Sequence, residues 1–172
     1  MLFRWLNQMH LLHHMQQTDI SLFRKQLDVI QTIHFITEQF VSLLLEDPVR
    51  PTIPHTDRIG ENKDIFVFRD EDDVVKAITC VSYQKTIPTT EGELFEKCID
   101  PSVAVFYTIW SYAAGAGRSL IQAAQEDIKT NEPEIKTYVT LSPKTEMARR
   151  FHHKNGAITL RENKDSVNYQ YH

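Results

Sequence analysis

The chain has 172 residues, 41% of them hydrophobic and 24% charged, with a formal net charge of -4. These values are typical of a globular domain with its own core, and the negative charge argues against the basic surface of a general nucleic-acid-binding protein. No apolar run is long enough to cross a bilayer, and the N-terminus lacks the pattern of a signal peptide. Cys80 and Cys98 are too few for a disulfide framework and predict buried free thiols. We therefore expect a cytoplasmic protein without a nucleic-acid or membrane partner.

The first 47 residues are predicted to form a helical part. Apolar residues recur at helical spacing in Leu2–Gln17 and again in Ile20–Glu46, and the proline-rich segment Asp47–His55 ends the second helix. His10 and His14 fall on one face of the first helix, a spacing that suits a metal ion. No third ligand is evident nearby, so the sequence predicts polar surface histidines and no metal site.

Residues 57–172 are predicted to form a sheet-containing core that completes a single domain over residues 1–172. The predicted strands are Ile65–Arg69, Val74–Tyr83, Val103–Trp110, Glu134–Leu141, Ala157–Glu162 and Ser166–Tyr171. Short helices are predicted near Glu93–Cys98 and over Lys144–His153, the latter capped by Ser142 with Pro143 in its first turn.

The strand Val103–Trp110, the helix that follows it and the strand Glu134–Leu141 form a crossover unit. Such a unit predicts two parallel, adjacent strands at the centre of the sheet. The remaining strands are joined by hairpins, for which antiparallel pairing is expected. The predicted fold class is α/β (α+β), with a mixed, mostly antiparallel sheet flanked by helices.

The loop Ser111–Arg118 carries the strongest chemical signal in the chain. Gly115 and Gly117 stand where a buried strand leads into an amphipathic helix, so the backbone can approach a ligand closely. The free N–H groups of the first helical turn then favour an anion, and Arg118 adds a positive charge. Tight packing of helix on sheet is the other use of such small residues. The spacing matches neither a Walker loop nor a dinucleotide fingerprint.

Two segments resemble the signatures of the GNAT superfamily of acyl-CoA-dependent acyltransferases. Tyr112–Gly117 is similar to Q/R-x-x-G-x-G/A, with Tyr112 in the place of Gln or Arg, and Ala148–Ala157 is similar to A-x-x-F-Y-x-K-x-G-F. The resemblance implies that coenzyme A or an acyl-CoA binds with its pyrophosphate on the backbone of the glycine loop. The implied cofactor-binding residues are Tyr112, Ala113, Ala114, Gly115, Ala116, Gly117 and Arg118.

Other motifs resemble the catalytic domain of malonyl-CoA decarboxylases. These motifs are L-S-P at Leu141–Pro143, F-H-x-x-N-G-A at Phe151–Ala157 and N-Y-x-Y at Asn168–Tyr171. In that family the histidine of the second motif works with a serine near an F-Y-S-I strand, so the resemblance implies a catalytic role for His152. Trp110 occupies the expected place of the serine, which leaves Thr108 and Ser111 as the nearby candidate hydroxyls.

Three functions follow from these resemblances and stay open at this point. The first is decarboxylation of malonyl-CoA to acetyl-CoA and CO2, for which an imidazole can deliver the proton. The second is transfer of an acyl group from acetyl-CoA or another acyl-CoA to an amine of a small molecule or protein. The third is a non-catalytic acyl-CoA-binding module. The oligomeric state is left open by the sequence.

Overall fold

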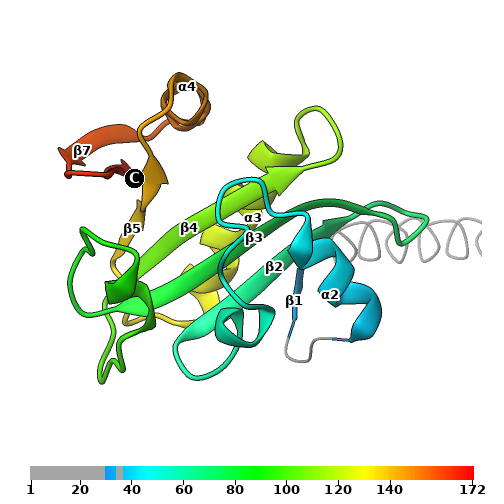
Figure 1. Ribbon diagram of the computed structural model, residues 1–172, viewed down its shortest axis with the longest axis horizontal. Helices are drawn as coiled ribbons and strands as arrows, with labels where there is room; N and C mark the ends of the chain where they lie inside the picture. The colour runs from blue at the N-terminus through cyan, green and yellow to red at the C-terminus, as the bar shows by residue number, and fades with distance from the viewer. Residues whose placement is uncertain (1–29, 34–36) are drawn as a thin grey trace, which may run out of the picture.

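The computed structural model describes residues 30–33 and 37–172. An eight-stranded sheet forms the body of the molecule, with the strand order β1-β2-β3-β4-β5-β8-β6 and with β7 paired to β8 (Figure 1). The strands are β1 (Gln31–Thr32), β2 (Lys63–Arg69), β3 (Val75–Gln84), β4 (Val103–Ser111), β5 (Thr137–Thr140), β6 (Ser142–Pro143), β7 (Ile158–Glu162) and β8 (Ser166–Tyr171). The helices are α2 (Glu38–Leu45), α3 (Ala116–Asn131) and α4 (Glu146–Lys154), with 3-10 turns at His55–Arg58 and Gly92–Phe95.

The central crossover is confirmed. β4 and β5 are parallel neighbours in the middle of the strand order, and every other strand pair is antiparallel. The structure thus has the mixed, mostly antiparallel sheet that the sequence predicts. Among the described helices, none combines the length and the apolar character that a membrane crossing requires.

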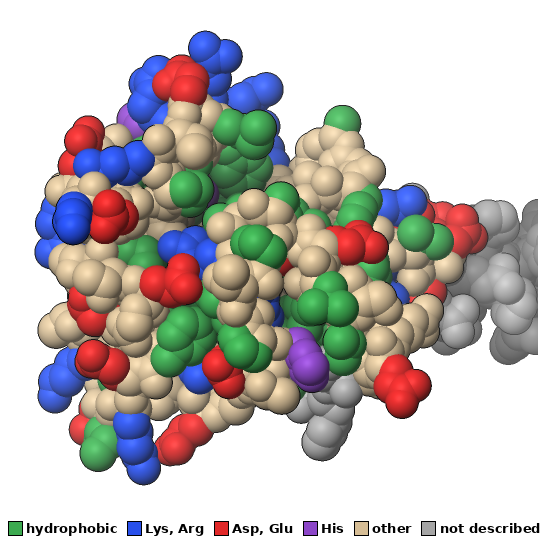
Figure 2. Space-filling model, in the orientation of Figure 1, with side chains coloured by type: hydrophobic (Ala, Val, Ile, Leu, Met, Phe, Trp, Pro, Cys, Tyr) green, Lys and Arg blue, Asp and Glu red, His purple; other side chains and the backbone are tan. Residues whose placement is uncertain are grey.

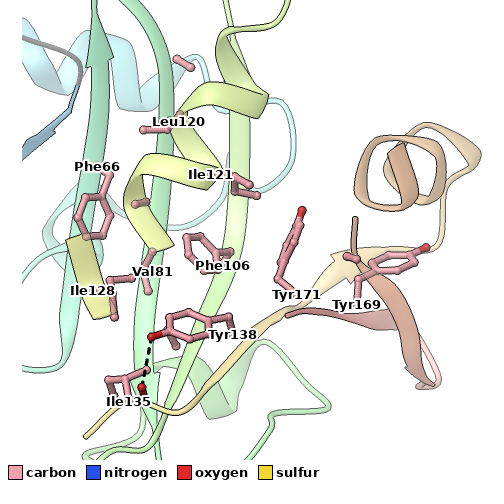
Figure 3. Packing of buried hydrophobic residues seen from close by; sticks show 14 of the residues in the cluster. Phe66, Val81, Phe106, Leu120, Ile121, Ile128, Ile135, Tyr138, Tyr169 and Tyr171 are labelled. Atoms are coloured by element: carbon pink, nitrogen blue, oxygen red, sulfur yellow. Dashed lines mark hydrogen bonds between the residues drawn. The ribbon is translucent and has the colours of Figure 1, made fainter. Parts of the chain in front are cut away.

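Two hydrophobic layers cover the two faces of the sheet. On one face, Leu120, Ile121 and Ile128 of α3 pack against Phe66 and Phe106 (Figure 3). On the opposite face, a second buried cluster joins α2 to the strands through residues that include Phe40, Leu44, Ile78, Val105 and Tyr107. Both cysteines are free and buried, as predicted. Burial of apolar side chains on both faces explains why β4 is apolar along almost its whole length.

A β-bulge interrupts the alternation of side chains between the two faces of β4 beyond Phe106. Val81 lies opposite Phe106 and Cys80 lies opposite Thr108, so Tyr107 is an extra residue in β4. A bulge shifts the later side chains by one position relative to the faces of the sheet. Trp110 therefore belongs to the α2-side cluster and Ile109 packs on the α3 side, the reverse of what an uninterrupted strand would give.

The helix predicted over Ile20–Glu46 is wrong in its central part. Gln31 and Thr32 form β1 and pair with Val67 and Phe66 at the edge of the sheet, and α2 spans only Glu38–Leu45. Pairing with an exposed strand edge outweighs the local helical pattern, because propensity is a weak preference compared with tertiary contacts. The predicted helix Leu2–Gln17, with His10 and His14, lies outside the described residues.

The segment before α4 also differs from the expectation. Thr145, not Ser142, caps α4, since its side chain accepts a hydrogen bond from the amide of Ala148. Ser142 and Pro143 instead form the short strand β6 and pair with Val167 and Ser166 of β8. The fifth strand is correspondingly shorter than predicted and ends at Thr140. The helix expected near Glu93–Cys98 is a 3-10 turn at Gly92–Phe95.

Candidate active site

The glycine loop forms the N-terminus of α3 as predicted. Gly115 caps the helix with a φ of 81°, a left-handed conformation that L side chains rarely adopt. The amides of Ala116, Arg118 and Ser119 are bonded to carbonyls of Ala113 and Gly115 within the loop. No hydrogen bond of the described chain uses the amide of Gly117, and no side chain caps this helix end. The turn thus offers a helix N-terminus at which an anion is favoured.

Two side chains of the glycine loop, those of Tyr112 and Arg118, differ in their contacts. Tyr112 donates its hydroxyl hydrogen to Glu46, 2.7 Å away, and accepts a hydrogen bond from the indole of Trp110, so its ring is directed toward α2. Arg118 is exposed and has no ion-pair partner among the described residues. Among the cofactor-binding residues implied by the resemblance, Arg118 therefore supplies an uncommitted charge, whereas Tyr112 is held by two polar contacts.

The central strands separate next to this loop. β4 and β5 pair only from Val103 opposite Thr137 to Phe106 opposite Thr140. Past that point β4 continues to Ser111, whereas the chain after β5 turns into β6 and pairs with β8. The bulge at Tyr107 lies where the pairing ends, and bulges bend a strand and increase its twist. The result is an opening in the sheet, with α3 on the β4 side and α4 with the C-terminal strands on the other.

His152 lies on the far side of this opening and is 4% exposed. Its Nε2 is 2.8 Å from Ser142 Oγ, and its Nδ1 is 2.7 Å from the hydroxyl of Tyr171. The imidazole stacks on Tyr169, with ring centroids 4.8 Å apart. Its neighbour Phe151 extends to α3, where a ring carbon would lie 3.4 Å from a Cβ added at Gly117. The helix that carries His152 is therefore in contact with the start of the glycine loop helix.

His153 is directed away from this cluster. It is exposed, and its Nε2 is 3.0 Å from Thr159 Oγ1. The two adjacent histidines diverge by about 100° on the helix, so only one can be buried. The buried one is His152, the residue to which the resemblance assigns a catalytic role.

Burial keeps His152 neutral at pH 7. Desolvation, with a smaller contribution from His153, lowers the pKa of His152 from 6.5 to about 4. A buried imidazole loses the hydration that would stabilise its charged form. Burial likewise raises the pKa of the Tyr171 hydroxyl. A neutral imidazole between two hydroxyls can accept a proton at one nitrogen while it releases one at the other.

The hydroxyl beside His152 is neither of those predicted. Thr108 is buried and donates its hydroxyl hydrogen to Asp47 on the α2 side of the sheet. Ser111 lies at the end of β4, with its Oγ 3.6 Å from the Cβ position of Gly117. Neither residue is hydrogen-bonded to His152, whereas Ser142 is. Ser142 belongs to the L-S-P motif at Leu141–Pro143. In the sequence this residue is interpreted as a helix cap, which does not predict its contact with His152.

Basic side chains gather over α4, where Figure 2 shows them around an acidic group. Arg149 and Arg150 both pair with Glu146 at 2.7 Å, and all three side chains are more than half exposed. These exposed pairs stabilise the fold little, so the arginines remain accessible to an anionic ligand. Within residues 30–33 and 37–172, no three histidine, cysteine, aspartate or glutamate side chains are grouped to hold a metal ion.

The low pKa of His152 predicts that acidification destabilises the fold. Between pH 6.5 and 4 the unfolded chain binds a proton at His152 that the folded chain does not, so the free energy of unfolding rises with pH in this window. Lowering the pH from 7 to 5 should cost about 2 kcal/mol through this residue. Urea unfolding at both pH values should show that His152→Gln removes most of this loss, whereas His153→Gln retains it. An unchanged pH dependence in His152→Gln would contradict the assignment.

Comparisons with known proteins support the fold. No family model and no curated protein sequence matches the chain. Among solved structures, malonyl-CoA decarboxylase from Rhodopseudomonas palustris is similar with a TM-score of 0.68 and 20% identity, over 93% of this chain and 64% of that one. A Bacillus subtilis acetyltransferase in complex with CoA is similar with a TM-score of 0.57 and 14% identity, over 83% and 97% of the two chains. A putative acetyltransferase of the GNAT family from Desulfovibrio desulfuricans has a TM-score of 0.53 and 13% identity, over 82% and 97%.

The similarity to the decarboxylases extends over part of their length. The chain spans 35% to 64% of the three malonyl-CoA decarboxylase structures it matches. At identities of 23% or less, these matches establish the arrangement of helices and strands. The chain therefore has a GNAT fold and resembles the decarboxylase structures as well as the acetyltransferases.

Proposed function

We propose that the chain binds an acyl-CoA and catalyses a malonyl-CoA decarboxylase-like reaction, from malonyl-CoA to acetyl-CoA and CO2. The observation that carries the proposal is the buried, neutral His152 held between Ser142 and Tyr171 at the opening between β4 and β5. The similar acetyltransferase from Bacillus subtilis binds CoA, which supports an acyl-CoA ligand for this fold. The uncapped helix at Gly115 and the free charge of Arg118 suit its pyrophosphate.

Decarboxylation breaks the bond between the carboxylate carbon and the methylene carbon. The electron pair moves onto the thioester oxygen as an enolate, and the methylene carbon then takes up one proton. Ser142 can deliver that proton and recover it from His152 Nε2, while His152 Nδ1 takes a proton from Tyr171. In this relay the imidazole exchanges one tautomer for the other and remains neutral, in keeping with its low pKa. Solvent restores the proton on Tyr171.

Acyl transfer to an amine is the second candidate, and the protonation state of His152 favours it. A neutral imidazole is in the form that can accept the proton that an amine loses as its nitrogen attacks the thioester carbonyl. The match with this chain covers almost the whole length of the two acetyltransferase structures, which supports acyl transfer as a candidate. The cytoplasmic location and the amine acceptor remain predictions, and the oligomeric state stays open.

Two parallel assays separate these functions. The protein is incubated with malonyl-CoA while acetyl-CoA is measured, and with acetyl-CoA and a panel of amines while free thiol is measured. We expect acetyl-CoA in the first assay. Free thiol only in the second would establish acyl transfer, and CoA binding without product in either would establish a binding module.

The position of the CoA pyrophosphate is tested at Gly117. This glycine has an ordinary helical conformation, so a side chain causes no backbone strain there, but a Cβ would already lie 3.4 Å from Phe151. Gly117→Val should therefore weaken CoA binding about tenfold or more while α3 remains folded. Calorimetric titration with CoA measures the affinity, and circular dichroism checks the fold. Gly92→Val, in open space in the 3-10 turn Gly92–Phe95, is the control. Equal affinities for the wild type and Gly117→Val would place the pyrophosphate elsewhere.

A further inference from the structure

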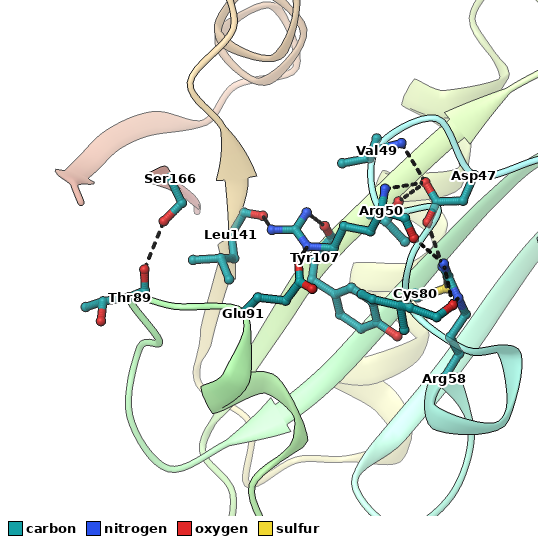
Figure 4. A network of polar contacts seen from close by, with 12 residues as sticks. Asp47, Val49, Arg50, Arg58, Cys80, Thr89, Glu91, Tyr107, Leu141 and Ser166 are labelled. Atoms are coloured by element: carbon teal, nitrogen blue, oxygen red, sulfur yellow. Dashed lines mark hydrogen bonds and ion pairs between the residues drawn. The ribbon is translucent and has the colours of Figure 1, made fainter. Parts of the chain in front are cut away.

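A buried arginine joins the two strands where they separate. Arg50 donates from Nη1 to the carbonyl of Tyr107 on β4 at 2.5 Å and from Nη2 to the carbonyl of Leu141 after β5 at 2.8 Å (Figure 4). Its side chain is 8% exposed. The guanidinium thus occupies backbone acceptors that neighbouring parallel strands would otherwise use, and it lies across the opening of the sheet.

The charge around Arg50 is balanced by a residue at the surface. Arg58 and Asp47 form a buried pair 2.6 Å apart, with side chains 1% and 0% exposed. The counter-charge of Arg50 is Glu91, whose carboxylate lies 2.9 Å from Nε but is 48% exposed. Nε makes no hydrogen bond of good geometry with any described residue, so this ion pair is close but poorly aligned. Without Glu91, the buried groups would consist of two cations and one anion.

Arg50 is linked to the proposed proton relay through Leu141 and Ser142. Leu141 accepts the hydrogen bond from Arg50, and the next residue, Ser142, contacts His152. The loop that carries Glu91 extends to the C-terminal strands, where Ser166 and Asn168 donate to the carbonyls of Thr89 and Pro88. An anion held by Arg50 would therefore lie beside the relay, under a loop that borders both sides of the opening.

We propose that Arg50 recognises the terminal carboxylate of a dicarboxylic acyl group, and that Glu91 occupies this position in the free protein. The inference rests on the proposed binding of acyl-CoA. Exchange of the Glu91 carboxylate for the substrate carboxylate keeps the charge of the buried network balanced. Displacement of Glu91 by an uncharged acyl group would leave Arg50 buried without a counter-charge. Arginine is suited to this exchange because its remaining N–H groups can hold both oxygens of a carboxylate.

The contact should raise affinity and should not accelerate the chemical step. Loss of CO2 moves negative charge away from the carboxylate, so a guanidinium at that position stabilises the bound substrate more than the transition state. Arg50 is therefore a specificity-determining residue that lowers KM for carboxylate-bearing acyl-CoA. His152 and Ser142, in contrast, are expected to affect kcat.

The test uses two stable thioethers that differ only in the carboxylate, S-(2-carboxyethyl)-CoA and S-ethyl-CoA. Calorimetric titration of the full chain should show that Glu91→Gln tightens binding of the carboxyethyl compound about tenfold, because the internal competitor has lost its charge. Binding of the ethyl compound should not change. Glu96→Gln, an exposed glutamate of the same loop, is the matched control and should affect neither compound.

Arg50→Gln tests the opposite effect. Without the guanidinium, the preference for the carboxyethyl compound over the ethyl compound should be abolished. Should this variant fail to fold, the Glu91→Gln result decides alone. An unchanged ratio of affinities in Glu91→Gln, or equal tightening of both compounds, would overturn the role of Arg50 while acyl-CoA binding stands. Failure of the wild type to bind either compound would overturn the proposed function and this inference with it.

Discussion

Replacement of His152 with glutamine is expected to lower turnover of malonyl-CoA by about 100-fold or more, the usual scale for loss of a general acid or base. Glutamine fills much of the same space and can hydrogen-bond Ser142, but it cannot accept a proton on one side and release one on the other. The affinity for CoA should change little, because the proposed pyrophosphate contacts lie in the glycine loop and not at His152. Steady-state kinetics at pH 7 and calorimetric titration with CoA measure the two effects.

The adjacent histidine is the matched control. His153 is exposed and contacts Thr159 at the surface, so His153→Gln should retain nearly full activity. Ser142→Ala should lower turnover as His152→Gln does, because it removes the hydroxyl that links the imidazole to the substrate in the proposed relay. Comparable losses in both histidine variants, or full activity in His152→Gln, would show that another group moves the proton.

Replacement of Arg58 with methionine is expected to reduce the free energy of unfolding by about 3–5 kcal/mol. Arg58 is fully buried, pairs with Asp47 at 2.6 Å and donates to the carbonyls of Arg50 and Ile53. Methionine leaves the Asp47 carboxylate buried without its counter-charge, and desolvation of an unpaired anion is costly. Urea unfolding at pH 7 measures the loss.

An exposed pair provides the comparison for this variant. Arg149→Met removes an ion pair to Glu146 that is more than half exposed, and it should cost less than about 1 kcal/mol. The double variant Asp47→Asn with Arg58→Met should lose less than the sum of its single variants, since each single change leaves one charge unpaired. Equal small losses for Arg58→Met and Arg149→Met would mean that the buried pair is solvated in the folded protein.

Much of the fold could be predicted because it depends on short-range patterns. The apolar strand Val103–Trp110, the helical spacing after Gly117 and the hairpin before Ser166 are each visible within about ten residues. The helix between β4 and β5 returns the chain to the end of the sheet from which β4 started, so the two strands are parallel. The helix predicted over Ile20–Glu46 failed for the opposite reason, since the partner of Gln31–Thr32 is a strand about 35 residues later.

Part of the candidate site could be predicted from the sequence, and part of it depends on how distant strands pair. The glycine loop follows from local spacing, whereas His152 is singled out by its place in the motif at Phe151–Ala157. The structure shows a left-handed Gly115 and a buried His152 at these places. The contact of His152 with Ser142 and Tyr171 depends on how β6 and β8 pair. A helix-capping pattern could not reveal it, because the same Ser–Pro pair also suits the start of a helix.

The sequence by itself determined the elements that arise from neighbouring residues: the central crossover, the glycine turn and the burial of one histidine of an adjacent pair. Only the tertiary structure decided which groups meet at the opening of the sheet. Arg50 reaches Leu141 across 91 positions, and the bulge at Tyr107 sets where β4 and β5 part. Such contacts depend on strand register, in which a shift of one residue exchanges the two faces of a strand. Local periodicity does not specify that register, and so the arginine at the opening became evident only in the folded chain.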